Sequence, residues 1–140
     1  MADRNAYTQP QSGLLGEAGT MKRFGCPSTA LATTDLALNK TVALFKVPRG
    51  FVLTSLSATV SDMDTSGSPA LVFHIGDASD NDRFIASATT GQAGGTNTTL
   101  ASTGLRYEFT DETEIVWTTA TAAATAAAGT VTVDFIGYAK

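Results

Sequence analysis

The sequence predicts an all-β fold: an antiparallel, jelly-roll-like β-sandwich of about eight strands, preceded by an extended N-terminal arm. Thr and Ala supply 45 of the 140 residues, and Thr suits the half-exposed face of a sheet. Short β-rich runs recur between turn signals, and no amphipathic helix separates them. Eight antiparallel strands in two sheets match a jelly roll, and the same count also fits an eight-stranded barrel.

The first 26 residues differ from the rest, so the sequence predicts a flexible arm over 1–26 and a sandwich domain over 27–140. The arm is rich in Gly, Gln and Asn, and its larger apolar side chains are isolated: Leu14, Leu15, Met21 and Phe24. This composition buries too little apolar area to fold alone. Two interpretations remain open. The arm is either a frayed terminus or a segment that orders on a partner through those four side chains.

Strand signals then follow in order along the chain. An alternating run over 30–38 is weak, and one over 41–47 is stronger and ends in a turn containing Pro48 and Gly50. Further strands are predicted over 51–60, 70–75, 83–89, 105–109, 113–119 and 130–139. Gly, Ser, Asp and Pro predict loops over 62–69 and 91–97. The Ala-rich segment 120–129 is too short to hold a helix alone and is predicted to be a loop.

The charge distribution argues against nucleic acid and suggests a surface that another protein covers. Net charge is −4; residues 1–26 carry three basic and two acidic residues, a net +1, which leaves −5 for the remainder. Phosphate binding needs clustered Lys and Arg. Only 16% of residues are charged, and 115–133 carry no charge. Small Thr, Ser and Ala side chains lose little entropy when an interface buries them. The single cysteine, Cys26, excludes an internal disulfide.

Residues able to perform chemistry are few. His74, the only histidine, lies between Phe73 and Ile75 in a predicted strand and is expected to point away from both. The densest acidic cluster comprises Asp77, Asp80, Asn81 and Asp82. It lacks the glycine and closing glutamate of an EF-hand loop. We therefore expect a solvated turn whose side chains cap the backbone, without a metal ion.

The remaining acidic and aromatic candidates also favour a structural interpretation. Asp111, Glu112 and Glu114 cluster before a predicted strand, where neighbours lie side by side rather than across a cleft as glycosidase carboxylates do. Trp117 is expected in the core rather than stacked on a sugar. The sequence therefore predicts no catalytic residue, no metal and no cofactor, and the protein is not expected to be an enzyme.

The order of motifs from residue 41 onward resembles a known family. The matching segments are Lys46-Val47-Pro48-Arg49-Gly50, Ile75-Gly76-Asp77, Asp82-Arg83-Phe84-Ile85-Ala86, Gly104-Leu105-Arg106-Tyr107 and Gly129-Thr130-Val131. They resemble the small jelly-roll cement (decoration) proteins of tailed bacteriophages, and the chain is similar in size to the cement protein of a Bordetella phage. The resemblance implies a non-enzymatic virion protein, made in the host cytoplasm, that binds the outer surface of an assembled HK97-like capsid. It transfers no individual binding residue.

The resulting expectation is a structural protein that stabilises a capsid by bridging neighbouring capsomers. Its partners would be the major capsid protein and a second copy of itself, with neither nucleic acid nor membrane involved. A homodimer interface is expected in the uncharged region 118–129, around Ala123 and Ala127. The alternative is a lectin-like module of a virion fibre or tail that contacts host glycans. Clustered exposed aromatic residues, or Ca²⁺ in the 77–82 loop, would favour that alternative.

Overall fold

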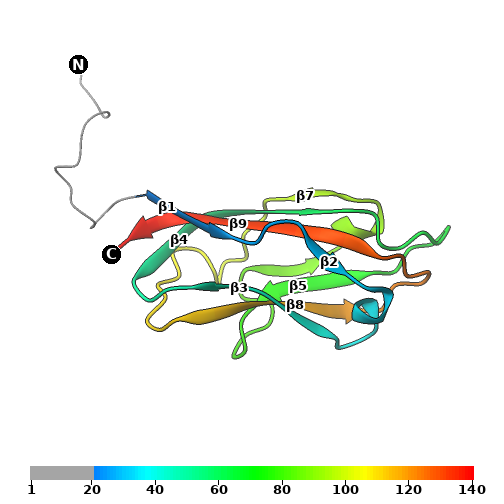
Figure 1. Cartoon of the computed structure of the whole chain (residues 1–140), viewed down its shortest axis with the longest axis horizontal. Coiled ribbons are helices and arrows are strands. Elements are labelled where there is room, and N and C mark those ends of the chain that lie inside the picture. Colours follow the sequence, from blue (N-terminus) through cyan, green and yellow to red (C-terminus); the bar gives the residue numbers. More distant parts are fainter. Residues whose placement is uncertain (1–20) are drawn as a thin grey trace, which may run out of the picture.

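The computed structural model describes residues 21–140, which form two packed antiparallel sheets, as predicted (Figure 1). The first sheet has the order β1 (Met21–Gly25), β9 (Gly129–Ala139), β4 (Phe51–Val60) and β7 (Gly95–Asn97), and β2 (Thr29–Leu31) also pairs with β9. The second sheet has the order β3 (Thr41–Val47), β8 (Thr113–Thr121), β5 (Val72–Gly76) and β6 (Ile85–Ala88). Two short 3₁₀ helices, η2 (Thr33–Leu36) and η3 (Thr90–Gln92), lie in the connections.

The strand pairs are nested, which is the topology of a jelly roll. β5 pairs with β6, β4 with β7, β3 with β8, and both β1 and β2 with β9. The chain is thus one long hairpin folded over into two sheets. β9 and β4 pair over nine residues of each strand. They form the centre of the first sheet, as β8 and β5 do in the second.

The core lies between the two sheets and is rich in aromatic rings. Trp117 of β8 is fully buried and stacks on Phe73 of β5, with ring centroids 4.1 Å apart. Its indole N–H donates to Thr119 Oγ1 at 2.9 Å, so its polar group is satisfied. Phe135 meets Phe45 and Phe84 edge-on across the sandwich. Such pairs each add about 1 kcal/mol beyond burial, and the predicted core position of Trp117 is confirmed.

The segment 105–109 is not the regular strand that its alternation predicts. Residues around Gly104 form a turn, and Arg106 has a left-handed φ of 58°. This reversal leaves Leu105 58% exposed, while Phe109 is fully buried. The chain then follows the beginning of β4 through two backbone bonds, Leu53 N–H to Tyr107 O and Phe109 N–H to Phe51 O. A local turn therefore replaces the first half of the expected strand.

Two further segments differ from the sequence prediction. The run 30–38 contains only the short β2 before η2, because the Asp35 carboxylate accepts the Ala32 N–H at 2.8 Å and closes a 3₁₀ turn. The predicted loop 91–97 contains β7, which pairs with the last three residues of β4. Gly94 precedes β7 and Gly95 begins it, with φ of 81° and 144°, conformations that favour glycine.

The sandwich begins earlier than residue 27. β1 pairs with β9 from Met21↔Tyr138 to Gly25↔Asp134, and Cys26 is buried with its N–H donating to Val133 O. Five residues of the predicted arm therefore belong to the first sheet, and Cys26 packs against it. The rest of the arm, 1–20, lies outside the described residues. Within 21–140, no helix is long and apolar enough to cross a membrane.

Candidate functional site at the distal end of the sandwich

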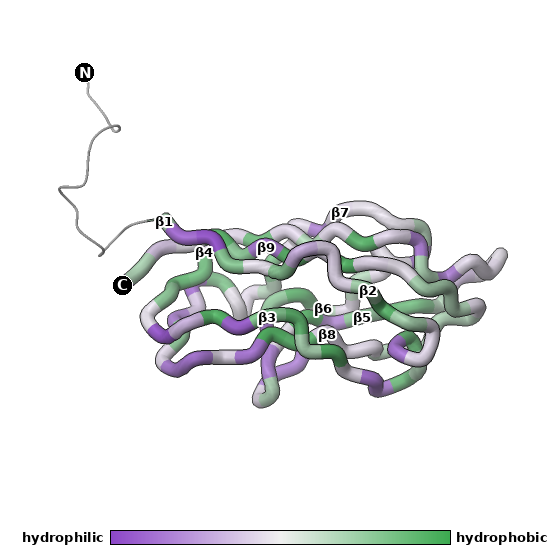
Figure 2. Tube along the Cα trace, in the orientation of Figure 1, coloured by the Kyte–Doolittle hydropathy of each residue, from purple (hydrophilic) through white to green (hydrophobic). Residues whose placement is uncertain are grey.

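The two ends of the elongated sandwich differ in composition. The proximal end carries the beginning of β1, the 48–50 turn and the C terminus at Lys140 (Figure 1). The tip of the distal end is formed by the β4–β5 loop, residues 61–71, and the β8–β9 loop, residues 122–128, with η2 beside them. Hydrophilic residues are prominent on β1 and on the proximal parts of β3 and β8 (Figure 2). In the distal loops, the charged residues are Asp62 and Asp64.

Asp64 holds the two distal loops together. Its side chain is 1% exposed, and its carboxylate accepts five backbone N–H groups. Three come from its own loop: Ser66 at 3.4 Å, Ala70 at 2.7 Å and Leu71 at 3.0 Å. The other two, Ala124 and Thr125, donate at 2.9 Å each from the β8–β9 loop, about sixty residues away in sequence. A single carboxylate thus fixes both loops relative to each other.

The environment of Asp64 keeps it ionised. Burial alone would raise the pKa of this carboxyl, but the N–H groups of Thr125, Ala70, Ala124 and Leu71 outweigh that effect and lower its pKa far below the ordinary value. Two backbone bonds reinforce the junction, Thr65 N–H to Thr125 O and Ala127 N–H to Met63 O, each 3.0 Å. The distal loops are therefore ordered by internal hydrogen bonds.

The outward surface of the two distal loops consists of small side chains, and among its exposed residues Asp62 is the charged one. Its exposed residues are Asp62, Thr65, Gly67, Ser68, Pro69, Ala124, Thr125, Ala126 and Ala128. Ala123 and Ala127, the two predicted contact residues of this region, are only half-exposed. Ala123 packs against the core and donates its N–H to Leu36 O at 3.1 Å, and Ala127 donates to Met63 O. Ala124 and Ala126 are thus the better placed to meet a partner.

The predicted contact residues of the arm lie far from the distal loops. Met21 is 64% exposed at the beginning of β1, whereas Phe24 packs partly buried against Phe51, with ring centroids 5.0 Å apart. Leu14 and Leu15 lie outside the described residues. The structure therefore does not gather the predicted contacts at one place: Met21 and Phe24 are proximal, and Ala123 and Ala127 are distal.

The acidic loop 77–82 is closed by an arginine. Asp77 accepts Arg83 Nε at 2.7 Å, while its other oxygen accepts the N–H groups of Ser79 and Asp80 and the Ser79 hydroxyl. The predicted backbone capping is confirmed, although Asp77 itself is buried rather than solvated. Burial opposes ionisation, but the hydrogen bonds from Arg83 and Ser79 lower the pKa of Asp77 overall. In the described part of the chain, no three His, Cys, Asp or Glu side chains group as metal ligands.

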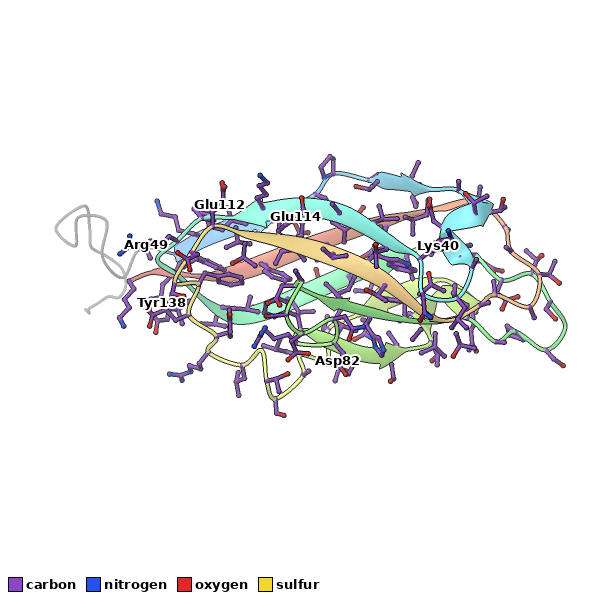
Figure 3. All side chains as sticks on the ribbon, turned by 90° about the horizontal axis from the view of Figure 1, so that it is seen from below. Lys40, Arg49, Asp82, Glu112, Glu114 and Tyr138 are labelled. Atoms are coloured by element: carbon purple, nitrogen blue, oxygen red, sulfur yellow. The ribbon has the colours of Figure 1, made fainter. Side chains whose placement is uncertain are left out.

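The other candidates for chemistry serve the fold or face solvent. His74 points away from the buried Phe73 and Ile75, as predicted, and its Nδ1 accepts the Ser87 N–H at 2.9 Å. Glu112 and Glu114 are exposed near the proximal end (Figure 3). Glu112 lies 3.9 Å from Lys46 in a surface ion pair. Among the described residues, these side chains do not form a catalytic constellation.

Sequence reasoning missed Asp64, the most consequential polar residue of the distal end. Asp in a loop of Ser, Gly and Pro signals local backbone capping, and Ser66 fits that pattern. The donors at 124 and 125 are brought in by the tertiary fold alone. Nothing in the spacing along the chain marks them as partners of Asp64.

Comparison with known proteins finds two solved phage structures of similar fold. No family model matches the sequence, and no curated protein does. A chain of the cyanophage Pam1 capsid asymmetric unit matches with a TM-score of 0.78 and 26% identity, over 99% of each chain. A chain of the Ralstonia phage GP4 capsid matches with a TM-score of 0.65 and 24% identity, over 95% of this chain and 90% of that one. These similarities support a structural, capsid-associated role.

Proposed function

We propose that this protein binds the outer surface of an assembled phage capsid and stabilises it by bridging neighbouring capsomers. The observation that carries the proposal is the match along nearly the whole chain to a component of the cyanophage Pam1 capsid asymmetric unit. The resemblance of the turn and strand motifs to phage cement proteins, including that of a Bordetella phage, supports the same role. The partner would be the major capsid protein of an HK97-like shell, on the outside of the virion.

The distal end has the properties of a docking surface for such a partner. Its exposed Ala, Thr, Ser, Gly and Pro side chains lose little entropy on burial. The Asp64 hydrogen bonds order both loops before binding, which reduces the further cost of ordering them at an interface. A protein that binds only the assembled lattice stabilises it by mass action. Many weak contacts of this kind, repeated over a shell, would be sufficient to stabilise the assembled capsid.

Self-association remains part of this proposal. β6 and β7 are edge strands, and each lies at one end of its sheet. A sheet edge can pair with a strand of another molecule, and a two-fold dimer is the commonest closed arrangement. A dimer would present two distal ends to two capsomers. In such a dimer the exposed residues Ala124 and Ala126 would face the shell.

The lectin-like alternative has less support from the described residues. The exposed large apolar side chains in this part of the chain are Met21, Leu38, Leu105 and Ile136, and they are aliphatic rather than the aromatic rings that stack on sugars. The carboxylate of Asp77, the most buried acidic group of the 77–82 loop, already holds Arg83. These two observations favour capsid docking over glycan binding.

The proposal is tested by mixing the purified protein with phage heads that lack it and sedimenting the mixture. We expect saturable binding to assembled heads and none to unassembled capsid protein, because the site would span a seam between capsomers. Decorated heads should release their DNA at a higher temperature than bare heads. Absence of saturable binding to heads, combined with binding to host glycans, would overturn the proposal in favour of the lectin-like function.

A further inference from the structure

The proximal end contains a small apolar groove. Phe24 of β1, Phe51 of β4, Pro48 of the β3–β4 turn and Ala139 of β9 line it, with Lys22 and Arg49 beside them. Its volume is about 120 Å³. An apolar cavity of about 150 Å³ accommodates a benzene molecule. The groove therefore has room for one branched aliphatic side chain.

Two aromatic rings in contact form the floor of the groove. Phe24 contacts Phe51 edge-on, at an interplanar angle of 83°, and Phe51 is only 2% exposed. Lys140 N–H donates to Gly50 O at 2.8 Å and ties the C terminus to the turn that forms one wall. Because its walls come from three different strands and this turn, the groove is already formed without a ligand. Its aromatic floor favours an aliphatic group.

The basic rim of the groove favours a ligand that also carries a negative charge. Arg49 is exposed at this end of the molecule (Figure 3). Its guanidinium favours a carboxylate next to the bound aliphatic group. A surface ion pair of this kind contributes little energy. The aliphatic group would therefore supply most of the binding, and the charge would set the direction of the ligand across the groove.

The chain itself has a segment near the groove that combines an aliphatic side chain with a carboxylate. Leu14 and Leu15 are followed two residues later by Glu17. Residues 16–20 connect Leu15 to Met21, so Leu15 lies within roughly 20 Å of the beginning of β1 even when this connection is fully extended. Lys22, which lines the groove, is the next residue of β1. Gly16 and Gly19 give the connection the backbone freedom to reverse direction.

We propose that the groove binds residues 14–17 of the same chain, with one of the two leucines on the Phe24–Phe51 floor and the Glu17 carboxylate beside Arg49. A tether this short gives the segment a high effective concentration at its own groove, above that of a segment from another copy. The two leucines are then covered in the free protein. This proposal does not depend on capsid binding.

Backbone amide NMR spectra of the full-length protein test the proposal. In the Leu14→Ser/Leu15→Ser variant, the Gly50, Phe51 and Ala139 amide resonances should shift, while those of the distal loops stay unchanged. Tyr7→Ser is the matched control, because it removes a large side chain from the same arm outside the segment; it should leave the groove resonances in place. Unchanged groove resonances in the leucine variant would overturn the proposal.

A charge exchange tests the orientation of the segment. Arg49→Glu should shift the groove amides toward their positions in the leucine variant, and adding Glu17→Arg should return them toward wild type. Failure of the double variant to restore the spectrum would exclude the Glu17–Arg49 contact. The wild-type groove resonances should be independent of protein concentration in a dilution series. If they change on dilution, the segment comes from a second copy and the assignment to the same chain is wrong.

Discussion

The distal and proximal ends of this sandwich are ordered by opposite means. At the distal end, one buried carboxylate accepts five backbone N–H groups from two loops, and the outward surface consists mostly of small uncharged residues. At the proximal end, an edge strand is held by aromatic packing, and ion pairs such as Lys140–Glu108 at 2.8 Å lie on the surface. The carboxylate that orders the distal loops is buried, whereas the ion pairs of the proximal end are exposed.

This contrast indicates how an uncharged surface can be built without losing order. Loops of Ala, Thr, Ser and Gly have few side-chain contacts to hold them, so their backbone N–H groups need a common acceptor. Asp64 provides it from within, and the exterior stays free for a partner. The proximal end needs no such device because Phe24 and Phe51 supply apolar packing.

The largest effect is expected from removing that acceptor. Asp64→Ala should lower the melting temperature by roughly 10 °C, because several N–H groups would lose their partner at once. Asp62→Ala is the matched control in the same loop, since Asp62 is exposed and accepts the Asp64 N–H; it should shift the melting temperature only slightly. Equal shifts in the two variants would mean that Asp64 does not organise the distal end.

The proximal end should respond to a loss of packing rather than of charge. Phe24→Ala should reduce the free energy of unfolding by about 2 kcal/mol, less than for a fully buried ring, because Phe24 is half-exposed. The measurement is urea denaturation, with Lys140→Ala as the control for the nearby surface ion pair, which should leave the free energy of unfolding nearly unchanged because the pair is exposed. A larger effect from Lys140→Ala than from Phe24→Ala would reverse the contrast between the ends.

Acid should weaken the distal end. The pKa of Asp64 is lower in the folded protein than in the unfolded chain, so its contribution is complete above the unfolded value of about 3.9 and is lost as pH falls toward the folded value. Urea denaturation of the wild type should therefore show falling stability below about pH 4. Asp77 contributes with the same sign. Asp64→Asn should flatten the slope, and an unchanged slope would contradict the role of its ionised form.

The smallest effect on stability is expected at the outward surface. Ala124→Asp combined with Ala126→Asp should change the free energy of unfolding by no more than about 0.5 kcal/mol per site, because both side chains are exposed. Thermal and urea denaturation measure it. A substantial loss of stability would show that these residues support the fold, as Ala123 does through its contact with the core.

Periodicity predicted most of the sandwich because strand faces are a local property. Val131, Val133 and Phe135 alternate in the sequence and are fully buried. The segment 105–109 has the same alternation, but the left-handed Arg106 interrupts it. No pattern of hydrophobicity reports a single backbone dihedral. β7 was not predicted because the glycines of 91–97 indicate a loop. Its strand conformation comes from pairing with β4.

The candidate site was predicted only in part. The absence of charge over 115–133 pointed to the β8–β9 loop, but which alanines face outward depends on its contacts with Leu36 and Met63. Asp64 acts through residues about sixty positions away. Such a contact forms only when the β4–β5 and β8–β9 loops meet in the folded protein, so the composition of either loop does not predict it.

The central claim is that the distal surface of small side chains docks on the assembled capsid, and the affinity of the Ala124→Asp/Ala126→Asp variant for phage heads tests it most directly. Ala43→Asp/Ala78→Asp is the matched control, since these two alanines are also exposed but lie outside the distal loops and outside the β6 and β7 edges. We predict binding at least about tenfold weaker for the distal variant, a loss of about 1.4 kcal/mol, and near wild-type binding for the control. Wild-type affinity of the distal variant, with its fold intact, would contradict the claim.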